Sequence, residues 1–524
     1  MSDVLIGQGF HLRNDPKNWS MHQPYPPLAP LYAASYLRER RYEVAFYDAM
    51  LADPSLEAWT AALERDRPEF AVLYEDNFNF LTKMCPLHMR EAALEMAARA
   101  REVGATVIVS SSDAADRAEE YLSGAADYIL HGEGEPALTS LLDRLTGRTE
   151  TPLDAIDGLI YRPDGEVRTA SGHGGETSMR EPIDDLDALP RPAWDLVDLD
   201  RYRAIQREHH GFFSLNMITS RGCPFGCNWC AKPFWGRMYH TRSPADVAEE
   251  MQYLETELGV DHVWFMDDMF GVRQGWTGEL ADELERRDVR IPFKSLNRVD
   301  LLLRDGEIEN LRRAGCQIVW SGVESGSQKI LDAMDKGITV EQIRAATSRL
   351  KDAGIEVGFF LQFGYPGETR ADIRKTFRLV RECRPDQIGV SVSYPLPGTK
   401  FYEMVEDQLG EKENWSDSDD LAMMFDGPYP TGFYRRLHRI MHHDFRLRKA
   451  WDRITGRRSG SDLRGTNWAK ELAVLAGYGA LLPLEHLALE YYARKPHDGL
   501  DELLTREAAG GDGAPAEPDG AKKR

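Results

Sequence analysis

The stretch Ser-Arg-Gly-Cys-Pro-Phe-Gly-Cys-Asn-Trp-Cys (residues 220–230) contains three of the six cysteines of this 524-residue chain. Cys223, Cys227 and Cys230 follow a Cys-x3-Cys-x2-Cys spacing, so three thiolates can converge on one soft metal centre. A structural zinc ion usually needs a fourth cysteine or histidine at finger-like spacing, and the nearest candidate, His240, has no partner histidine. The pattern favours an iron–sulfur cluster that keeps one iron open.

Two simpler interpretations of the cysteines stay open from spacing alone: a disulfide pair, or thiols that are merely buried. A disulfide would leave one cysteine of the three unpaired and would need an oxidising compartment. Six cysteines, half of them in one motif, are instead typical of a protein from a reducing cytoplasm.

The cysteine stretch follows the first strand of a regular alternation of strands and helices. Six strands are expected in this half, at Phe212–Thr219, His262–Met266, Phe293–Leu296, Gln317–Ser321, Glu356–Phe363 and Gln387–Ser393. Helical patterns separate them, and the repeat predicts a partial (β/α)6 barrel. Functional groups of such a barrel gather at the carboxyl ends of the strands, which is where the cysteines are expected.

The first 150 residues show a second α/β alternation. Strands are expected at Val4–Gly7, Val44–Tyr47, Phe70–Tyr74, Thr106–Ser110 and Asp127–Leu130, which predicts a Rossmann-like, doubly wound parallel sheet. The predicted ligand edge contains Ser110 and the turn Gly132-Glu133-Gly134-Glu135, whose glycines lower the steric cost of a tight turn. Residues 151–205 are interpreted as a linker with a hairpin turn at Pro163-Asp164-Gly165. The barrel is expected over 206–420, a helical region over 421–505 and a disordered tail over 506–524.

The cysteine spacing, with Trp229 just before the third cysteine, resembles the radical S-adenosylmethionine (SAM) superfamily. The resemblance implies that Cys223, Cys227 and Cys230 hold a [4Fe–4S] cluster whose open iron binds SAM. It further implies reductive cleavage to a 5′-deoxyadenosyl radical, with electrons from an external donor such as flavodoxin or ferredoxin. Trp229 occupies the aromatic position that this superfamily carries there and is included among the cofactor-binding candidates.

Polar residues at the later strand ends are implied by the same resemblance to bind SAM. Asp267 is expected to hold the amino group, Arg298 to meet a carboxylate, and Glu324 in Gly-Val-Glu-Ser-Gly (322–326) to accept from the ribose hydroxyls, while Asn297 is a further polar candidate beside Arg298. The alternatives are an ordinary pairing of Arg298 with Asp300 and a plain turn glutamate at 324.

The N-terminal half resembles the cobalamin-binding domain of one subgroup of that superfamily, through Pro26-Pro27-Leu28, Tyr47-Asp48-Ala49 and Gly132-Glu133-Gly134-Glu135. This implies that Ser110, Gly132, Glu133 and Gly134 contact a corrin ring. The chain departs from the pattern in lacking an Asp-x-His-x-x-Gly and in having Ser-Ser-Ser-Asp at 110–113. A Rossmann-like domain kept for structure or substrate binding is the alternative.

The reaction that this resemblance implies is cobalamin-dependent methylation of a carbon atom in a small-molecule or lipid substrate. The alternative is a radical cyclase, rearrangement or oxidoreductase-type enzyme whose cobalamin-like domain takes no part in methyl transfer. A net charge of −22 argues against nucleic acid as a partner. The chain shows no signal peptide pattern and no uninterrupted apolar stretch of about 18 residues, so a cytoplasmic protein without a transmembrane segment is expected.

The C-terminal region adds one further hypothesis. A basic segment around Tyr434–His443 precedes an apolar stretch, Leu472–Leu489, that Gly477, Gly479 and Pro483 interrupt. Together these segments can rest against a membrane surface and admit a lipid substrate. A helical cap on the barrel with a solvated basic face is the alternative.

Overall fold

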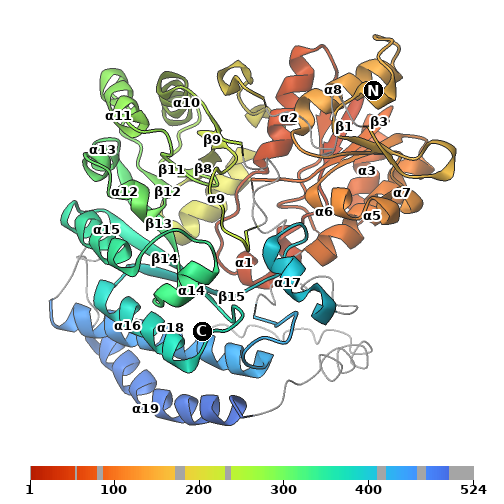
Figure 1. Ribbon diagram of the computed structural model, residues 1–524. Coiled ribbons are helices and arrows are strands. Elements are labelled where there is room, and N and C mark those ends of the chain that lie inside the picture. Colours follow the sequence, from red (N-terminus) through yellow and green to blue (C-terminus); the bar gives the residue numbers. More distant parts are fainter. Residues whose placement is uncertain are drawn as a thin grey trace, which may run out of the picture.

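The computed structural model describes residues 2–53, 56–78, 86–170, 183–230, 238–409, 421–456 and 468–494. Within these ranges two α/β units lie side by side, and a helical hairpin packs on the side of the second unit that is remote from the first (Figure 1). The tail expected over 506–524 lies outside the described residues.

The first unit is built on a seven-stranded sheet with the order β2-β1-β3-β4-β5-β6-β7. β1 to β5 are mutually parallel, as the sequence predicted, while β6 and β7 are antiparallel. The strands are β1 (Val4–Gly7), β2 (Val44–Phe46), β3 (Phe70–Tyr74), β4 (Thr106–Ser110), β5 (Tyr128–Leu130), β6 (Leu159–Tyr161) and β7 (Arg168–Thr169). The hairpin predicted around Pro163–Gly165 is thus present, and residues 159–169 of the expected linker extend this sheet.

Helices cover both faces of the first sheet, which explains its nearly continuous apolar strands. In β1, Val4 and Ile6 pack into one core while Leu5 packs into the other, because successive side chains point to opposite faces. The first core is closed by α2 (Leu28–Glu39) and α8 (Gly134–Leu145). The second is closed by helices that include α3 (Leu56–Asp66), α5 (Pro86–Glu102), α6 (Ser112–Asp116) and α7 (Ala118–Gly124).

From β1 the chain continues to β2 on one side of the sheet, whereas β3, β4 and β5 follow on the other side. The strand order therefore reverses between β1 and β3. In open parallel sheets, ligands bind at such a switch point, beyond the carboxyl ends of the strands. The segment after β1 begins at Gln8, and the segment after β3 begins at Glu75. These two segments therefore define the expected ligand edge of the first unit.

The second unit is a six-stranded, wholly parallel sheet with the order β15-β14-β13-β12-β11-β8. Its strands are β8 (Ser214–Met217), β11 (His262–Phe265), β12 (Phe293–Leu296), β13 (Cys316–Glu324), β14 (Glu356–Phe363) and β15 (Gln387–Val392). All six predicted strands are confirmed, with β12 and β14 at the predicted bounds. The sheet is the partial (β/α)6 barrel that the alternation predicted.

Helices alternate with these strands and start where local capping allows it. They include α10 (Pro244–Thr256), α11 (Trp276–Arg287), α12 (Val299–Leu302), α13 (Glu307–Arg313), α14 (Gln328–Ala333), α15 (Val340–Asp352) and α16 (Arg370–Cys383). Thr339 and Gln342 form a capping box at the start of α15, and Thr369 and Asp372 form another at α16. Each box satisfies backbone donors that the first helical turn leaves unpaired.

The segment before α2 and helix α9 (Leu199–His210) join the two units. Asn216 on β8 donates to the Pro26 carbonyl over 3.0 Å, and the Tyr25 hydroxyl lies 3.2 Å from the Ser214 hydroxyl. Gln206 in α9 donates to the Pro24 carbonyl over 2.7 Å. These contacts fix the first barrel strand against the N-terminal unit.

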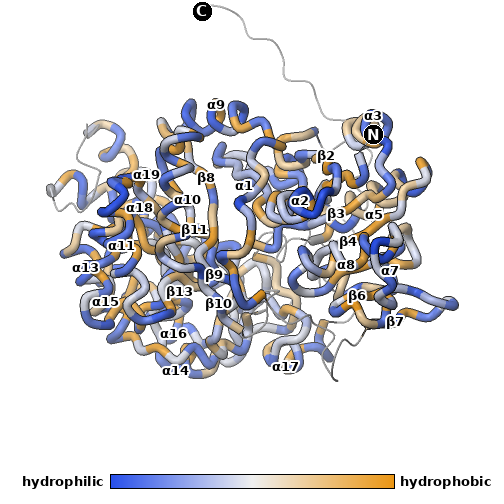
Figure 2. Tube along the Cα trace, turned by 90° about the horizontal axis from the view of Figure 1, so that it is seen from above, coloured by the Kyte–Doolittle hydropathy of each residue, from blue (hydrophilic) through white to orange (hydrophobic). Residues whose placement is uncertain are grey.

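Two long helices, α18 (Thr431–Ile454) and α19 (Trp468–Tyr492), follow α17 (Lys400–Leu409). Figures 1 and 2 both show α18 and α19 beside each other at the barrel, remote from the first sheet. Among the described residues, α19 is one helix whose length and composition suffice to cross a membrane, with a mean hydropathy of 1.5 over 18 residues. The sequence had predicted no segment long and apolar enough to span a membrane, and α19 is an exception to that expectation.

Candidate active site

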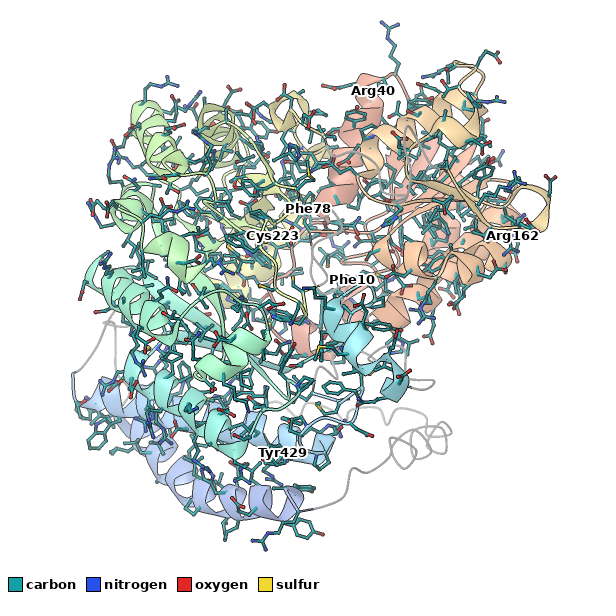
Figure 3. All side chains as sticks on the ribbon, in the orientation of Figure 1. Phe10, Arg40, Phe78, Arg162, Cys223 and Tyr429 are labelled. Atoms are coloured by element: carbon teal, nitrogen blue, oxygen red, sulfur yellow. The ribbon has the colours of Figure 1, made fainter. Side chains whose placement is uncertain are left out.

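The three cysteines lie on one loop at the carboxyl end of β8, as the sequence predicted. The loop follows β9 (Ser220–Arg221), and all three cysteines are half-buried and outside any disulfide. Gly222 opens the loop with φ +85°, and a Cβ there would lie 1.9 Å from the Met238 carbonyl oxygen. Only glycine permits this crossing of two backbone segments. Figure 3 shows Cys223 at the boundary between the barrel and the first unit.

Three thiols on one loop suit an iron–sulfur cluster, whose thiolate ligands bind different irons. In the described part of the chain, no three His, Cys, Asp or Glu side chains converge on a point where one metal ion can bind. An iron–sulfur cluster does not require such convergence, since its thiolate ligands are spread over several irons. Burial raises the pKa of Cys223, with Asp268 and Cys227 adding to the shift, so ligation there has to displace a proton.

Arg298 links the cysteine loop to the barrel wall. Its Nη1 lies 3.9 Å from Cys227 Sγ, and its guanidinium lies 4.1 Å from the centre of the Phe225 ring. Nε forms a 2.8 Å ion pair with Asp300, and Nη2 donates to the Lys336 carbonyl. The Arg298–Asp300 pair expected as an alternative is therefore present, with Arg298 buried beside the cysteines and Asp300 partly exposed.

Asn297 is buried, and its side chain bonds within the barrel. Its Oδ1 accepts from the Ser295 hydroxyl over 2.6 Å, and its Nδ2 donates to the Phe270 carbonyl over 3.4 Å. These bonds hold the carboxyl end of β12 in place next to Arg298. A direct contact of Asn297 with SAM remains a prediction.

Glu324 forms a buried ion pair with Lys336, a residue that the sequence did not single out. Lys336 Nζ lies 2.9 Å from Glu324 Oε1, and both side chains are less than one-tenth exposed. Burial opposes the charge on Lys336, but Glu324 and Cys227 outweigh it and raise its pKa. Glu324 has φ +58°, and a Cβ at Gly322 would lie 2.5 Å from its Oε1 and 2.6 Å from Lys336 Nζ. A strained glutamate against a glycine is typical of a functional site.

Trp229 lies next to the same ion pair, since Lys336 Nζ is 5.7 Å from the centre of its ring. Its indole Nε1 is buried and has no hydrogen-bond partner among the described residues. Arg298, Glu324 and Lys336, from three different segments of the barrel, thus lie beside the cysteine loop that carries Trp229.

Asp267 supports the start of the cysteine loop. It is buried, and it accepts from the Thr219 backbone N–H over 2.6 Å, the Ser220 N–H over 3.0 Å and the Thr219 hydroxyl. Burial raises the pKa of Asp267 to about 7, although these bonds oppose the shift. The contacts make it a positioning residue for the loop, and its contact with the SAM amino group remains a prediction.

Arg221, directly before Gly222, connects the cysteine loop to the first unit. Its Nη1 lies 3.1 Å from Glu133 Oε1, and its Nη2 lies 2.7 Å from Glu135 Oε1. All three side chains are at most 2% exposed. The guanidinium also lies 5.8 Å from the Tyr32 ring centre and 5.5 Å from that of Phe78.

Three of the four residues expected at the corrin have contacts within the protein, whereas the buried Ser110 hydroxyl has no hydrogen-bond partner among the described residues. Gly134 faces Tyr74, where a Cβ would lie 2.4 Å from the phenol oxygen, and Gly132 makes the turn with φ +87°. Ser110 is fully buried at the end of β4. Glu133 is held by Arg221 and by the Ile183 N–H. Contact of these four residues with a corrin remains a prediction.

Several buried polar atoms without a protein partner also lie at the switch point of the first sheet. In the described residues they include Gln8 Oε1, Glu75 Oε2 and both amide atoms of Asn77. Burial raises the pKa of Glu75 to about 8, although the 2.6 Å hydrogen bond that its carboxylate accepts from the Gly9 N–H acts to lower the pKa. Such atoms are costly unless a polar group pairs with them, so this edge fits a ligand that carries many polar groups. The sequence had not indicated these three residues.

Residues 217–380 match the family described as the Radical SAM superfamily. This part of the chain is a radical SAM domain. The chain is 30% identical over 292 residues to an uncharacterised methyltransferase of Pyrococcus horikoshii, covering 55% of this chain and 60% of that protein. It is 28% identical over 397 residues to the anaerobic magnesium-protoporphyrin IX monomethyl ester cyclase of Rubrivivax gelatinosus, covering 74% and 67%. The chain thus spans less than two thirds of the P. horikoshii relative.

Two solved structures share the arrangement of both units. The radical SAM methyltransferase TsrM of Kitasatospora setae, with cobalamin and a [4Fe-4S] cluster bound, has a TM-score of 0.63 at 19% identity and covers 79% of this chain and 76% of its own. The cobalamin-dependent radical enzyme OxsB, with aqua-cobalamin bound, has a TM-score of 0.68 at 17% identity and covers 97% and 75%. The predicted fold, a Rossmann-like sheet followed by a partial barrel, is confirmed.

Proposed function

We propose that this protein is a cobalamin-dependent radical SAM methyltransferase that modifies a small-molecule or lipid substrate. When bound, a reduced [4Fe–4S] cluster supplies an electron that cleaves SAM, and a corrin supplies a carrier for the methyl group. The proposal draws on the radical SAM domain, on the P. horikoshii relative described as a methyltransferase and on TsrM, described with both cofactors.

In this proposal residues of the barrel mouth hold the [4Fe–4S] cluster and SAM. Cys223, Cys227 and Cys230 ligate the cluster. The Arg298 guanidinium and the Lys336 ammonium place two buried positive charges next to the cysteine loop, where they favour a carboxylate such as that of SAM. Glu324 offers carboxylate oxygens to hydroxyl donors.

The observation that carries the proposal is the buried pairing of Arg221 with Glu133 and Glu135. It ties the loop that bears the cysteines to the turn between β5 and α8, so the barrel mouth and the ligand edge of the first sheet are neighbours. A radical generated at one cofactor can reach a substrate held against the other only if both edges are held together in this way.

We place the corrin at the switch point of the first sheet, near Gln8, Glu75 and Asn77. Their unpaired buried atoms can donate to and accept from the amide groups that surround a corrin ring. At neutral pH the raised pKa of Glu75 keeps its carboxyl group mostly protonated, so it can donate as well as accept.

A radical cyclisation or rearrangement is the second candidate. It is favoured by the R. gelatinosus cyclase, which aligns with 74% of this chain and 67% of its own length. The two candidates differ in the fate of the SAM methyl group, which reaches the product only in a methyl transfer.

The first experiment is anaerobic reconstitution of the chain with iron, sulfide and cobalamin, followed by absorption spectroscopy and quantification of both cofactors. We expect about four irons and one corrin per chain. The triple variant Cys223→Ala/Cys227→Ala/Cys230→Ala should lose the iron, while Cys383→Ala, a cysteine on α16 outside the loop, should keep it. Wild type with no more iron than the triple variant would refute the cluster assignment.

The second experiment follows methyl-labelled SAM in the reconstituted protein under reducing conditions. Transfer of label to a bound corrin supports the methyltransferase. Release of deoxyadenosine from protein that retains no corrin would instead support the cyclase-type candidate. An external one-electron donor such as flavodoxin or ferredoxin and a cytoplasmic location complete the proposal, and a net charge of −22 makes nucleic acid an unsuitable partner.

A further inference from the structure

Two of the three acidic side chains of α19, those of Glu471 and Glu485, point inward onto α18, whereas Glu490 is exposed and pairs with Arg370 of α16. Glu471 lies 3.0 Å from Arg453, and Glu485 lies 2.8 Å from His443 and 3.7 Å from Arg436. Both glutamates are less than one-tenth exposed. These pairs follow the whole length of the helix, so α19 lies flat and antiparallel along α18.

The outer face of α19 is predominantly apolar, with the exposed Glu490 at one edge, which is the reverse of the usual pattern for a surface helix. Exposed residues recur at three- and four-residue spacing on this face: Leu472, Ala476, Ala480, Leu484, Leu487 and Tyr491. Leu484 is 63% exposed and Leu487 is 69% exposed. The face extends for about 28 Å, and a contiguous apolar surface of this kind marks an interaction site.

The charge of this region differs in sign from that of the rest of the chain. Residues 431–495 contain thirteen lysine and arginine residues against six aspartate and glutamate residues, a net charge of +7 in a chain of −22. Arg439 and Arg446 of α18 are exposed. An apolar helix face within a cationic region is complementary to the surface of an anionic lipid bilayer, where negatively charged headgroups lie above the hydrocarbon.

We propose that the outer face of α19 docks on the surface of an anionic lipid bilayer, with the helix parallel to the membrane plane. The pairing with α18 holds α19 along the barrel rather than across a bilayer. Trp468 and Tyr491, both exposed, lie at its two ends and have the amphipathic rings that favour the headgroup level. A second copy of this chain fits the face less well, because two regions of charge +7 would repel each other.

The test is flotation of the whole 524-residue chain with vesicles of phosphatidylcholine that contain or lack phosphatidylglycerol. The double variant Leu484→Glu/Leu487→Glu places two charges on the outer face. Its charge-matched control is Met21→Glu/Met404→Glu, at positions 58% and 55% exposed elsewhere on the molecule. Because all four side chains are exposed, both variants should fold, which circular dichroism verifies.

We expect wild type and the control to float with anionic vesicles, more weakly as salt is raised, and the Leu484/Leu487 variant to bind at least tenfold more weakly. Absence of vesicle binding by wild type, or equal binding by both variants, would overturn the proposal. So would a wild-type dimer that the Leu484/Leu487 variant converts to a monomer, since the occupant would then be a second copy. The test needs no turnover, so its failure leaves the proposed reaction unaffected.

Discussion

Arg221 Nη2 lies 2.7 Å from Glu135 Oε1, and each side chain is 1% exposed, although 86 residues separate them along the chain. A buried guanidinium needs full compensation by hydrogen-bonded anions, and Glu133 provides the second one. One residue that immediately precedes the cysteine loop is thereby fixed by a turn of the other unit. This charged contact at the two candidate cofactor edges adds to the hydrogen bonds by which α9 and the segment before α2 join the two units.

Replacing Arg221 with methionine should destabilise the chain by roughly 3–5 kcal/mol, because two carboxylates would stay buried without their cation. Chemical unfolding of the cofactor-free chain measures the change. Arg38→Met is the matched control, since the Arg38–Asp195 pair of 2.8 Å is exposed and worth about 0–1 kcal/mol. Equal losses in the two variants would contradict a special role for the buried pair.

Glu75 should make stability depend on pH. Burial raises its pKa to about 8 in the folded chain, whereas the unfolded group titrates near its ordinary value of 4.5. The folded chain therefore holds this proton more tightly, and the stability that it contributes is full below pH 4.5 and is lost as pH rises toward 8. The loss is at most about 1.4 kcal/mol per pH unit.

The measurement that isolates this effect is the melting temperature of cofactor-free Glu75→Gln from pH 5 to pH 8.5. Glutamine keeps the oxygen that accepts from Gly9 and cannot ionise, so the variant should lose less stability than wild type as pH rises. Glu69→Gln, at an exposed position just before β3, should follow wild type. Parallel pH profiles for wild type and Glu75→Gln would show that Glu75 does not carry the dependence.

Lys336→Met should weaken binding of SAM by roughly 10–100-fold, about 1.4–2.8 kcal/mol, while the reconstituted chain keeps its iron. The substitution removes a buried cation next to the cysteine loop and leaves Glu324 unpaired. Equilibrium binding of SAM to reconstituted protein measures the effect. Lys329→Met, on the exposed side of α14, is the control and should bind as wild type does. Unchanged affinity in Lys336→Met would remove this residue from the SAM site.

Gly322→Ala should disturb the same ion pair by size alone. The added Cβ would lie 2.5 Å from Glu324 Oε1 and 2.6 Å from Lys336 Nζ, so the pair has to move. We expect weaker SAM binding and a melting temperature lowered by several degrees, as is usual for overpacking of 1–3 kcal/mol. Gly477→Ala, in α19 with open space around it, should match or exceed wild-type stability. A normal SAM affinity in Gly322→Ala would show that the pair can shift without consequence.

Local sequence determined the elements and the thiol loop. Strands such as Phe70–Tyr74 and Glu356–Phe363 were predictable to the residue, because burial on both faces imposes an apolar run whose ends the sequence marks. The spacing of Cys223, Cys227 and Cys230 is likewise local, and so the radical SAM domain could be predicted from residues 220–230. Residues 151–170 were harder to interpret, because two short strands joined to a distant sheet leave little periodic signal.

Only the tertiary structure decided which charges meet. Lys336 pairs with Glu324 twelve residues earlier, and Arg221 pairs with Glu135 from the other unit, through contacts that no spacing rule specifies. The same holds for α19, whose composition indicates an apolar helix but whose Glu471 and Glu485 face inward, where α18 provides Arg453 and His443. Hydrophobic periodicity is a property of neighbouring residues, whereas the compensation of a buried charge depends on whatever the folded chain brings within about 3 Å of it.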